Sequence, residues 1–428
     1  MVVFWLLLFV LIFNVFIESI FLHKIVTPTL IINSVFIIWL IIGRIGYLEQ
    51  FKPSYNSSIF IELNIIILDL FIILGGLKKN KQINIKCIDI NFDIFLKIFR
   101  YLSFGISLLI FINLAVNLYS GSIKIENVRN ISYSVAFGTK DYTKIYFNPI
   151  IYYTYQYLIR GFAFFDLTYS IGRLIYEKNY KISKLSLFNF ILFILIMQSR
   201  IEFMKVIIFL IIFFLYANIK IKTHVKRKLR KIGLIVGIAI FITLSIRTVA
   251  TEKNVIIHAF DSFIIDFSGS NYMFSCFYDE FQNGFRLKDS SIILKYLGGI
   301  GLLIELVLSF FGFKFDHTLV NNYLLKAHYI GSSDHYNAFY TIYFEFLNSG
   351  GIIGCVLFSA IFGYIIGRAF KDQERNNTLK STYIASFITY VMAMGTYNYV
   401  LSGIYALMII TCIIIANDNI HKEMKMYV

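Results

Sequence analysis

The chain has 428 residues, of which 58% are hydrophobic and only 15% are charged, and its mean hydropathy is +0.71. A soluble domain carries roughly a quarter charged residues and cannot bury so large an apolar fraction, so the composition excludes a soluble fold. A net charge of +15 would suit a nucleic-acid-binding protein, but here the basic residues lie in short loops between apolar runs. We therefore expect an all-α polytopic membrane protein that has no nucleic-acid partner.

Apolar runs long enough to cross a hydrocarbon core of about 30 Å recur along the whole chain. They predict membrane spans near residues 2–20, 25–43, 59–77, 99–119, 149–175, 185–198, 201–219, 232–250, 351–368, 381–397 and 400–416. One further apolar run, 292–311, fits a span, a re-entrant hairpin or a helix in the membrane interface, and we favour a membrane-hugging cap. Together the runs predict about 11 to 12 transmembrane helices.

Basic loops predict which side of the membrane each segment faces. Seven cationic residues lie between the spans near 201–219 and 232–250: Lys220, Lys222, Lys226, Arg227, Lys228, Arg230 and Lys231. The positive-inside rule places this loop in the cytoplasm, and four other basic segments fall on the same side if the spans alternate. The expected organisation is transmembrane helices in 1–250, a large outer loop with amphipathic or re-entrant helices in 251–350, and C-terminal spans with a short cytoplasmic tail in 351–428.

Arginines near the outer ends of spans are the first candidates for chemistry, because the positive-inside rule gives no reason for cations there. Arg200 ends a Gln-Ser-Arg motif on a short outer turn, and Arg247 lies near the outer end of a later span. Arg160 lies in the outer half of its run, where we expect Asp166 or Glu177 to pair with it. A guanidinium offers a fork of donors that matches phosphate oxygens, so two of them would suit a diphosphate head group. For Arg200, an anchor that snorkels to lipid head groups remains the alternative.

The second candidate is His335, where an outer loop enters an amphipathic helix. Asp334 precedes it, Asn337 follows closely, and Glu345 comes before a Gly-Gly pair and the next span. An imidazole in this position could take a proton from a hydroxyl nucleophile or orient a phosphate. A lone histidine is usually ordinary surface, so the residue gains weight only from its context.

These motifs, taken in order, resemble a known family. His335-Tyr-Asn-Ala-Phe, Glu345 and the Gly-Gly pair are similar to the His-Asn, Glu and Gly segment of the O-antigen polymerase and ligase superfamily. The Gln-Ser-Arg motif resembles its Ser-Arg signature, and Asp266-Phe-Ser-Gly-Ser-Asn-Tyr-Met-Phe resembles the start of the large periplasmic loop in oligosaccharide repeat-unit polymerases. The likeness covers about residues 195–370. It departs from the family pattern at Tyr336, which separates the histidine from the asparagine.

The resemblance implies a GT-C-like glycosyltransferase at the periplasmic face of the bacterial inner membrane that needs no metal or other cofactor. In the Wzy-type reaction, a glycan on undecaprenyl diphosphate is transferred to the terminal sugar of another undecaprenyl-diphosphate-linked repeat unit. By this likeness Arg200 and Arg247 would hold the donor diphosphate and stabilise it as it leaves, and His335 would assist the attacking hydroxyl. The expected substrate-binding residues are Arg160, Arg286, Asp334, Asn337 and Glu345. Expected partners are the lipid-linked donor and acceptor, membrane lipid, a chain-length regulator and a flippase.

Three alternatives stay open. An O-antigen ligase would share the same arginines and histidine but would take lipid A core as its acceptor. A lipid-linked oligosaccharide flippase or other transporter should show pseudo-symmetric halves and cations on both sides of a cavity, whereas the candidate cations here gather at one face. A membrane scaffold without catalytic activity is the third. The four cysteines, Cys87, Cys276, Cys355 and Cys412, lie far apart and predict neither a zinc site nor a disulfide framework.

Overall fold

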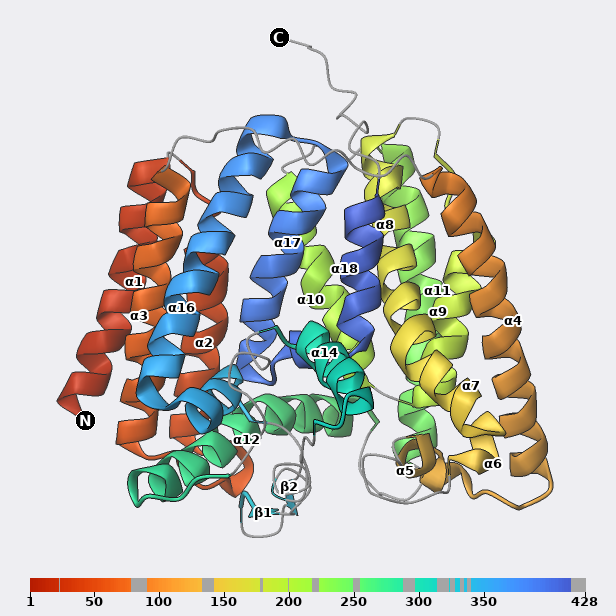
Figure 1. The fold of residues 1–428 in the computed structure, drawn as a ribbon, viewed down its shortest axis with the longest axis horizontal. Coiled ribbons are helices and arrows are strands. Elements are labelled where there is room, and N and C mark those ends of the chain that lie inside the picture. Colours follow the sequence, from red (N-terminus) through yellow and green to blue (C-terminus); the bar gives the residue numbers. More distant parts are fainter. Residues whose placement is uncertain are drawn as a thin grey trace. The chain divides into compact units, whose positions relative to one another are not determined.

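In the computed structural model of this protein, helices make up most of the described chain, and the two named strands have two residues each (Figure 1). The structure describes residues 1–22, 24–77, 91–132, 142–177, 180–198, 200–217, 223–248, 255–287, 297–313, 323, 328–331, 335–336 and 340–416. The predicted all-α fold is therefore confirmed for this part of the chain. Each predicted span coincides with helix over most of its length, and the run at 149–175 is built from three consecutive helical pieces.

The chain divides into two compact units, each assembled from separate stretches of sequence. Unit 1 comprises Met1–Gln82, Phe260–Asn376 and Ala385–Ser402, and unit 2 comprises Ile83–Ala259, Asn377–Ile384 and Gly403–Val428. Each unit thus draws on more than one of the three segments expected from the sequence.

Unit 1 is built on four long helices that run side by side (Figure 1): α1 (Val2–Leu22), α2 (Pro28–Ile45), α3 (Tyr55–Leu77) and α16 (Ile342–Asn376). Local sequence fixes the ends of α2. The Thr27 hydroxyl accepts a hydrogen bond from the amide of Leu30, Pro28 takes the first helical position, and Gly46 ends the helix in a left-handed conformation at φ 75°.

Glycines let α16 approach α3 closely. A methyl group added at Gly363 would lie 2.3 Å from the carbonyl oxygen of Leu68, and one added at Gly367 would lie 2.1 Å from that of Ile72. Small residues spaced four apart are typical of tightly packed membrane helices. At Gly351 (φ 61°) the helix breaks, so the turns that carry Glu345 are set off from the long apolar part.

The remaining elements of unit 1 belong largely to the segment predicted as the outer loop. They include α12 (Val255–Gln282), α14 (Gly299–Phe310), the antiparallel strands β1 (His328–Tyr329) and β2 (His335–Tyr336), and the short turns η1 (Tyr47–Glu49), η4 (Met394–Thr396) and η5 (Val400–Ser402). Trp39 of α2 stacks on Phe267 of α12 with ring centroids 4.7 Å apart. With 12 residues, α14 is about 18 Å long, so the described part of the 292–311 run is too short to cross a membrane.

Unit 2 is a second helical bundle. Its elements are α4 (Phe92–Tyr119), η2 (Ile125–Asn127), α5 (Val128–Ser132), α6 (Thr143–Tyr146), α7 (Pro149–Thr154), η3 (Tyr155–Ile159), α8 (Arg160–Tyr176), α9 (Lys184–Met197), α10 (Arg200–Ala217), α11 (Thr223–Thr248) and α18 (Tyr405–Ile415). The helix α17 (Leu379–Ala393) begins in unit 2 and ends in unit 1.

Five helices among the described residues are long and apolar enough to cross a membrane: α1, α2, α3, α4 and α16. Four of them form the core of unit 1 and one belongs to unit 2. Their length and composition support the membrane character expected from the sequence. The number of crossings, 11 to 12, stays a prediction.

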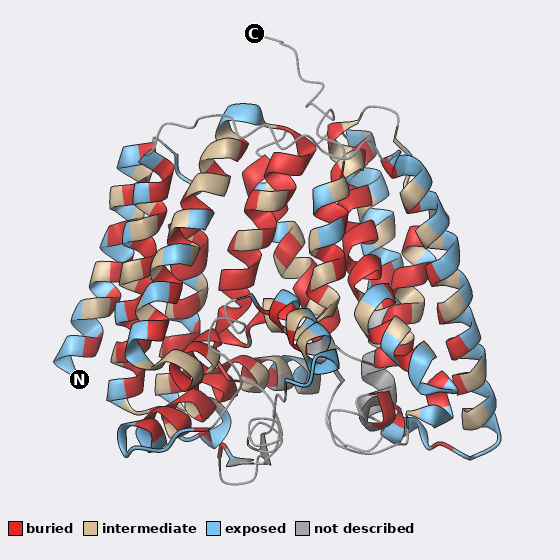
Figure 2. Ribbon diagram, viewed as in Figure 1, coloured by how far each residue is buried: buried red, intermediate tan, exposed pale blue. Residues whose placement is uncertain are grey.

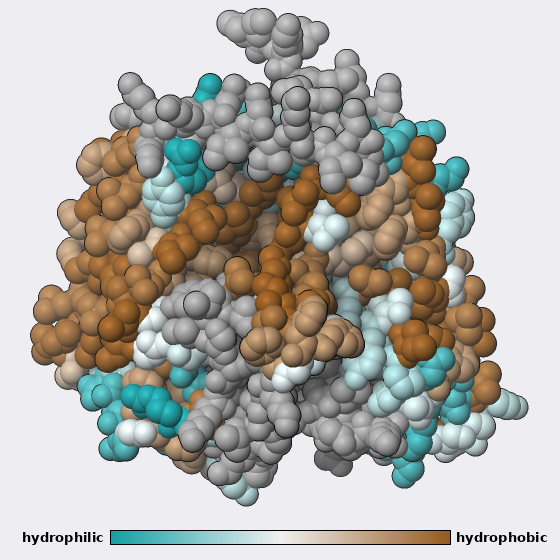
Figure 3. Space-filling model, viewed as in Figure 1, coloured by the Kyte–Doolittle hydropathy of each residue, from teal (hydrophilic) through white to brown (hydrophobic). Residues whose placement is uncertain are grey.

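Helix α1 shows the distribution of polarity that a lipid environment produces. Its exposed side carries large apolar side chains such as Phe9 and Phe16, and its buried side contains the polar Asn14 and Glu18 among leucines. Figure 2 shows the alternation of buried and exposed residues along the helices. In the space-filling view the helices of unit 1 present a largely hydrophobic surface (Figure 3). A helix on the surface of a soluble protein exposes its polar side chains to water, so an exposed apolar side with buried polar groups fits a bilayer.

Candidate functional site

Three charged side chains meet where α8 and α10 begin. The Arg160 Nη2 donates to Glu202 Oε1 at 2.5 Å, and the Lys205 Nζ donates to the same oxygen at 2.8 Å. The exposed fractions of the three side chains are only 15%, 5% and 4%. Among the described side chains, one carboxylate therefore faces two cations in a nearly dry setting.

Helix α18 closes this cluster with an aromatic ring. The Arg160 guanidinium lies 4.4 Å from the centroid of the Tyr405 ring, and the Lys205 Nζ lies 3.4 Å from the Tyr405 hydroxyl oxygen. Gly161 allows this approach, since a methyl group there would lie 2.2 Å from the carbonyl oxygen of Tyr405. A cation over a desolvated ring face gains electrostatic stabilisation, so Tyr405 supports the positive charge without neutralising it.

A π-helical turn, η3, sets the position of Arg160. It ends at Ile159, so Arg160 opens the α-helix that follows. From this turn the side chain of Gln156 offers its oxygen to the Arg160 Nη1 at 3.5 Å and donates to the backbone oxygen of Ser132 at 3.2 Å. Single π-helical turns within helices occur frequently at functional sites, where they re-aim side chains.

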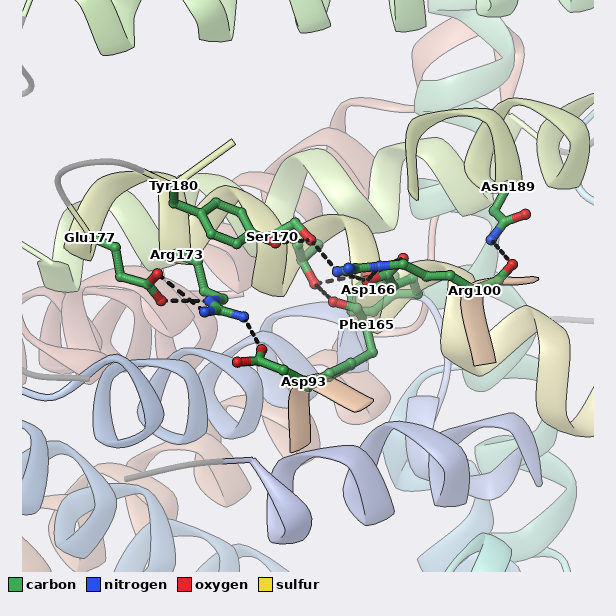
Figure 4. A network of polar contacts seen from close by, with 11 residues as sticks. Asp93, Arg100, Phe165, Asp166, Ser170, Arg173, Glu177, Tyr180 and Asn189 are labelled. Atoms are coloured by element: carbon green, nitrogen blue, oxygen red, sulfur yellow. Dashed lines mark hydrogen bonds and ion pairs between the residues drawn. The ribbon is translucent and has the colours of Figure 1, made fainter. Parts of the chain in front are cut away.

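The predicted partners of Arg160 were wrong. Asp166 instead binds Arg100 of α4 through both of its carboxylate oxygens, with the shortest contact at 2.6 Å, and Glu177 binds Arg173 (Figure 4). The reason is helical geometry. Residue 166 lies six positions after 160, about 240° around the helix, and residue 177 lies about 25 Å further along the axis.

Arg200, a predicted catalytic residue, is the first residue of α10 and precedes Glu202 by two positions. Gln198, in the turn before it, is in a left-handed conformation with φ 45°. Arg247 lies in the last turn of α11. The side chains of both arginines lie outside the described part of the structure, so their roles stay predictions.

The predicted residues of the His-Asn segment belong to unit 1. The backbone of His335 lies in β2, opposite Tyr329 of β1, and Glu345 lies in the first turn of α16 and is partly exposed. Asp334 and Asn337 lie outside the described residues, as does the side chain of His335. Since the candidate arginines 160, 200 and 247 belong to unit 2, their convergence with the histidine on one cavity stays a prediction.

Arg286, predicted to bind substrate, caps the end of α12. Its Nη1 donates to the backbone oxygens of Phe281 and Phe285 at 2.7 Å each, and the guanidinium lies 3.2 Å from the centroid of the Phe281 ring. A cation at this end of a helix also faces the negative pole of the helix dipole. The contacts therefore give this exposed arginine a structural role.

The sequence contains a signal for two members of the α8–α10 cluster. Glu202 and Lys205 are charged residues inside an apolar run, spaced three apart on one helix face, directly after the Gln-Ser-Arg motif. Tyr405 carried no comparable signal, because its contact with the cluster depends on how α18 packs. Among the described residues, no group of three or more His, Cys, Asp or Glu side chains could hold a metal ion.

No protein-family model, curated protein or solved structure matches this chain.

Proposed function

We propose that this protein polymerises undecaprenyl-diphosphate-linked oligosaccharide repeat units into an O-antigen-type or capsule-type polysaccharide at the periplasmic face of the bacterial inner membrane. The proposal includes a GT-C-like arrangement of 11 to 12 transmembrane helices. The sequence supports it through two motifs, since a Ser-Arg segment is followed along the chain by a segment similar to His-Asn.

The observation that carries the proposal is the buried cluster of Arg160, Glu202 and Lys205 at the start of α10. It adjoins Arg200 in sequence, and its three side chains are two cations and one carboxylate. Fixed cations in a site of low dielectric stabilise developing negative charge strongly, and a departing diphosphate carries such charge.

The charge at the other end of α10 supports a periplasmic position for the cluster. This helix has 18 residues, about 27 Å, and the exposed cations Lys226, Arg227, Lys228, Arg230 and Lys231 follow shortly after its C-terminal end. If those cations face the cytoplasm, the cluster at the start of α10 faces the periplasm. That is the side on which a lipid-linked repeat unit would be polymerised.

In the proposed reaction, a hydroxyl oxygen on the terminal sugar of the acceptor attacks the anomeric carbon of the donor glycan. The bond from that carbon to the diphosphate breaks, and undecaprenyl diphosphate leaves with the electron pair. His335 takes the proton of the attacking hydroxyl. Arg200 and Arg247 stabilise the leaving diphosphate, and the cluster around Arg160 adds positive potential.

Substitution of the arginines tests the proposal. Arg200→Ala and Arg247→Ala should each abolish the ladder of polymer lengths on a gel while the protein level in the membrane is unchanged by immunoblot. His335→Ala should strongly reduce chain formation. The matched control is Arg230→Ala, which removes an exposed cation from the opposite end of the spans and should leave the ladder intact.

A ladder of normal intensity from both arginine variants would refute the assigned roles. The products also separate the enzyme classes. Loss of a polymerase leaves a single repeat unit on each lipid A core, whereas loss of a ligase leaves the core unsubstituted.

A further inference from the structure

Three carboxylic acids lie inside the helix bundle of unit 1: Glu18 on α1, and Glu62 and Asp69 on α3. Each has an exposed fraction of 0%. All three belong to helices that are long and apolar enough to cross a membrane. An ionised carboxylate in such a place is strongly destabilised unless a cation pairs with it, and acidic residues within membrane spans commonly mark proton or ion pathways.

Asp69 is held by uncharged donors. Its Oδ2 accepts hydrogen bonds from the side-chain amides of Asn14 and Asn33 at 3.0 and 2.9 Å, while its Oδ1 has no hydrogen-bond partner among the described residues. The amide of Asn33 also donates to the backbone oxygen of Leu11 at 2.9 Å, which fixes its orientation. Two amides from two other helices thus position the carboxyl group without supplying the charge that an anion would need.

The groups that face Asp69 from the other helices are acidic or neutral. Glu18 of α1 is close enough to repel it when both are charged, and Tyr343 of α16, also fully buried, lies within electrostatic reach. Arg44 of α2 faces Glu62, which is seven residues and about 10 Å away along α3. With no cation at hand in the described structure, Asp69 is most stable as the neutral acid.

Glu18 connects Asp69 with the end of the bundle. Its Oε2 accepts from the amide of Thr29 at 3.0 Å, and its Oε1 has no hydrogen-bond partner among the described residues. Glu18 also lies within electrostatic reach of Glu374 on α16. Glu374 is 12% exposed and lies 3.7 Å from the half-exposed ammonium group of Lys24, so acidic groups extend from the interior to the surface.

We infer that Asp69 is a proton-binding site inside unit 1, and that it exchanges its proton through Glu18 with the solution at the end formed by Lys24 and Glu374. The proton is the ligand because a dry carboxyl group with one unpaired oxygen needs a single positive charge. A divalent metal would need more ligands than the described residues bring together. The inference does not rest on the proposed function, because none of these residues belongs to the candidate glycan site.

Infrared spectroscopy of the purified protein in lipid nanodiscs tests the inference. A protonated carboxyl group absorbs separately from a carboxylate, so wild-type protein should show at pH 7 a carboxylic-acid band that shifts in D2O. Asp69→Asn should remove one component of this band, because the buried Glu18 and Glu62 can contribute the rest. Asp279→Asn, which changes an exposed acid on α12, should leave the whole band unchanged. Glu18→Gln should keep the component assigned to Asp69 but slow its shift after mixing with D2O at least tenfold.

One variant and one change of cation control for a folding artefact and for a wrong ligand. Asn14→Leu leaves the acid in place and removes one amide donor, so the band should move in frequency, and an unchanged band would overturn the assigned contact. Loss of the Asp69 component on replacing K⁺ by Na⁺ at constant pH would assign the site to sodium and overturn the proton. An acid band in Asp69→Asn identical in shape and intensity to that of the wild type would show that Asp69 is ionised and would also overturn the inference.

Discussion

Each unit buries an aspartate, and the two are stabilised in opposite ways. In the described part of unit 2 both buried carboxylates have a cation: Asp166 faces Arg100, and Glu202 faces Arg160 and Lys205. In unit 1 the only side chains that donate hydrogen bonds to Asp69 in the described structure are two asparagine amides. Two equally buried aspartates are therefore stabilised differently, Asp166 by pairing with a cation and Asp69 by a bound proton.

An ion-paired aspartate and a neutral aspartic acid respond differently to mutation. Removing one member of a buried ion pair leaves the other charge unpaired in the interior, which costs far more than the pair itself contributed. Replacing a neutral acid by an amide of the same shape exchanges one uncharged group for another. Substitution of aspartate by asparagine therefore distinguishes the two units directly.

The largest effect should come from Asp166→Asn, which leaves the Arg100 guanidinium, 13% exposed, without its carboxylate. We expect a loss of about 3 to 5 kcal/mol in the free energy of unfolding. Asp69→Asn should cost less than about 1 kcal/mol at pH 7, because the charge does not change. Unfolding in mixed micelles with increasing SDS measures both values.

Equal losses in the free energy of unfolding of Asp166→Asn and Asp69→Asn would contradict this prediction, because they would mean that Asp69 is also a charged partner. The double variant Arg100→Met with Asp166→Asn controls for packing, since it removes both charges. It should recover part of the stability that Asp166→Asn loses.

A smaller effect is expected from the close packing of α16 against α3. Gly367→Ala would put a methyl group 2.1 Å from the carbonyl oxygen of Ile72, three residues from Asp69, and so push α16 away from α3. We expect a loss of about 1 to 3 kcal/mol from this overpacking. Because the separation admits water near Asp69, the infrared band of the carboxylic acid should weaken as well.

The matched control lies in unit 2. A methyl group added at Gly105 of α4 meets nothing within 4 Å, so Gly105→Ala should be neutral or stabilise the helix by up to about 1 kcal/mol. Destabilisation of similar size in both variants would point to a general effect of alanine rather than to the contact between α16 and α3.

The helices were readable from the sequence because each follows from a continuous local pattern. The apolar run near 2–20 became α1 and the run near 59–77 became the greater part of α3. The run at 292–311 was harder to interpret, since its described helix α14 has only 12 residues and apolar composition alone does not fix where a helix ends.

The contacts between helices were not readable, because they depend on packing between segments far apart in sequence. Glu202 lies 42 positions from Arg160, and nothing local makes it a better partner than Asp166. Asp69 is visible in the sequence as an acid inside the apolar run near 59–77, but its partners are not, since Asn14 and Asn33 reach it from two other helices. The division into units has the same origin: residues 1–82 pack with 260–376, and no composition change along the chain marks this pairing.

The smallest expected effect concerns Arg286, an exposed cation in unit 1 whose described donors go to backbone oxygens at the end of α12. Solvent screens such contacts, so Arg286→Ala should lower the free energy of unfolding by less than about 1 kcal/mol, well below the loss from Asp166→Asn in unit 2. Arg286→Lys should retain part of that stability, because an ammonium group can still donate to a carbonyl oxygen. If the arginine acts only as a helix cap, both variants keep a normal polymer ladder. A ladder lost in Arg286→Ala at unchanged protein level would instead place this side chain among the substrate-binding groups that the sequence predicted.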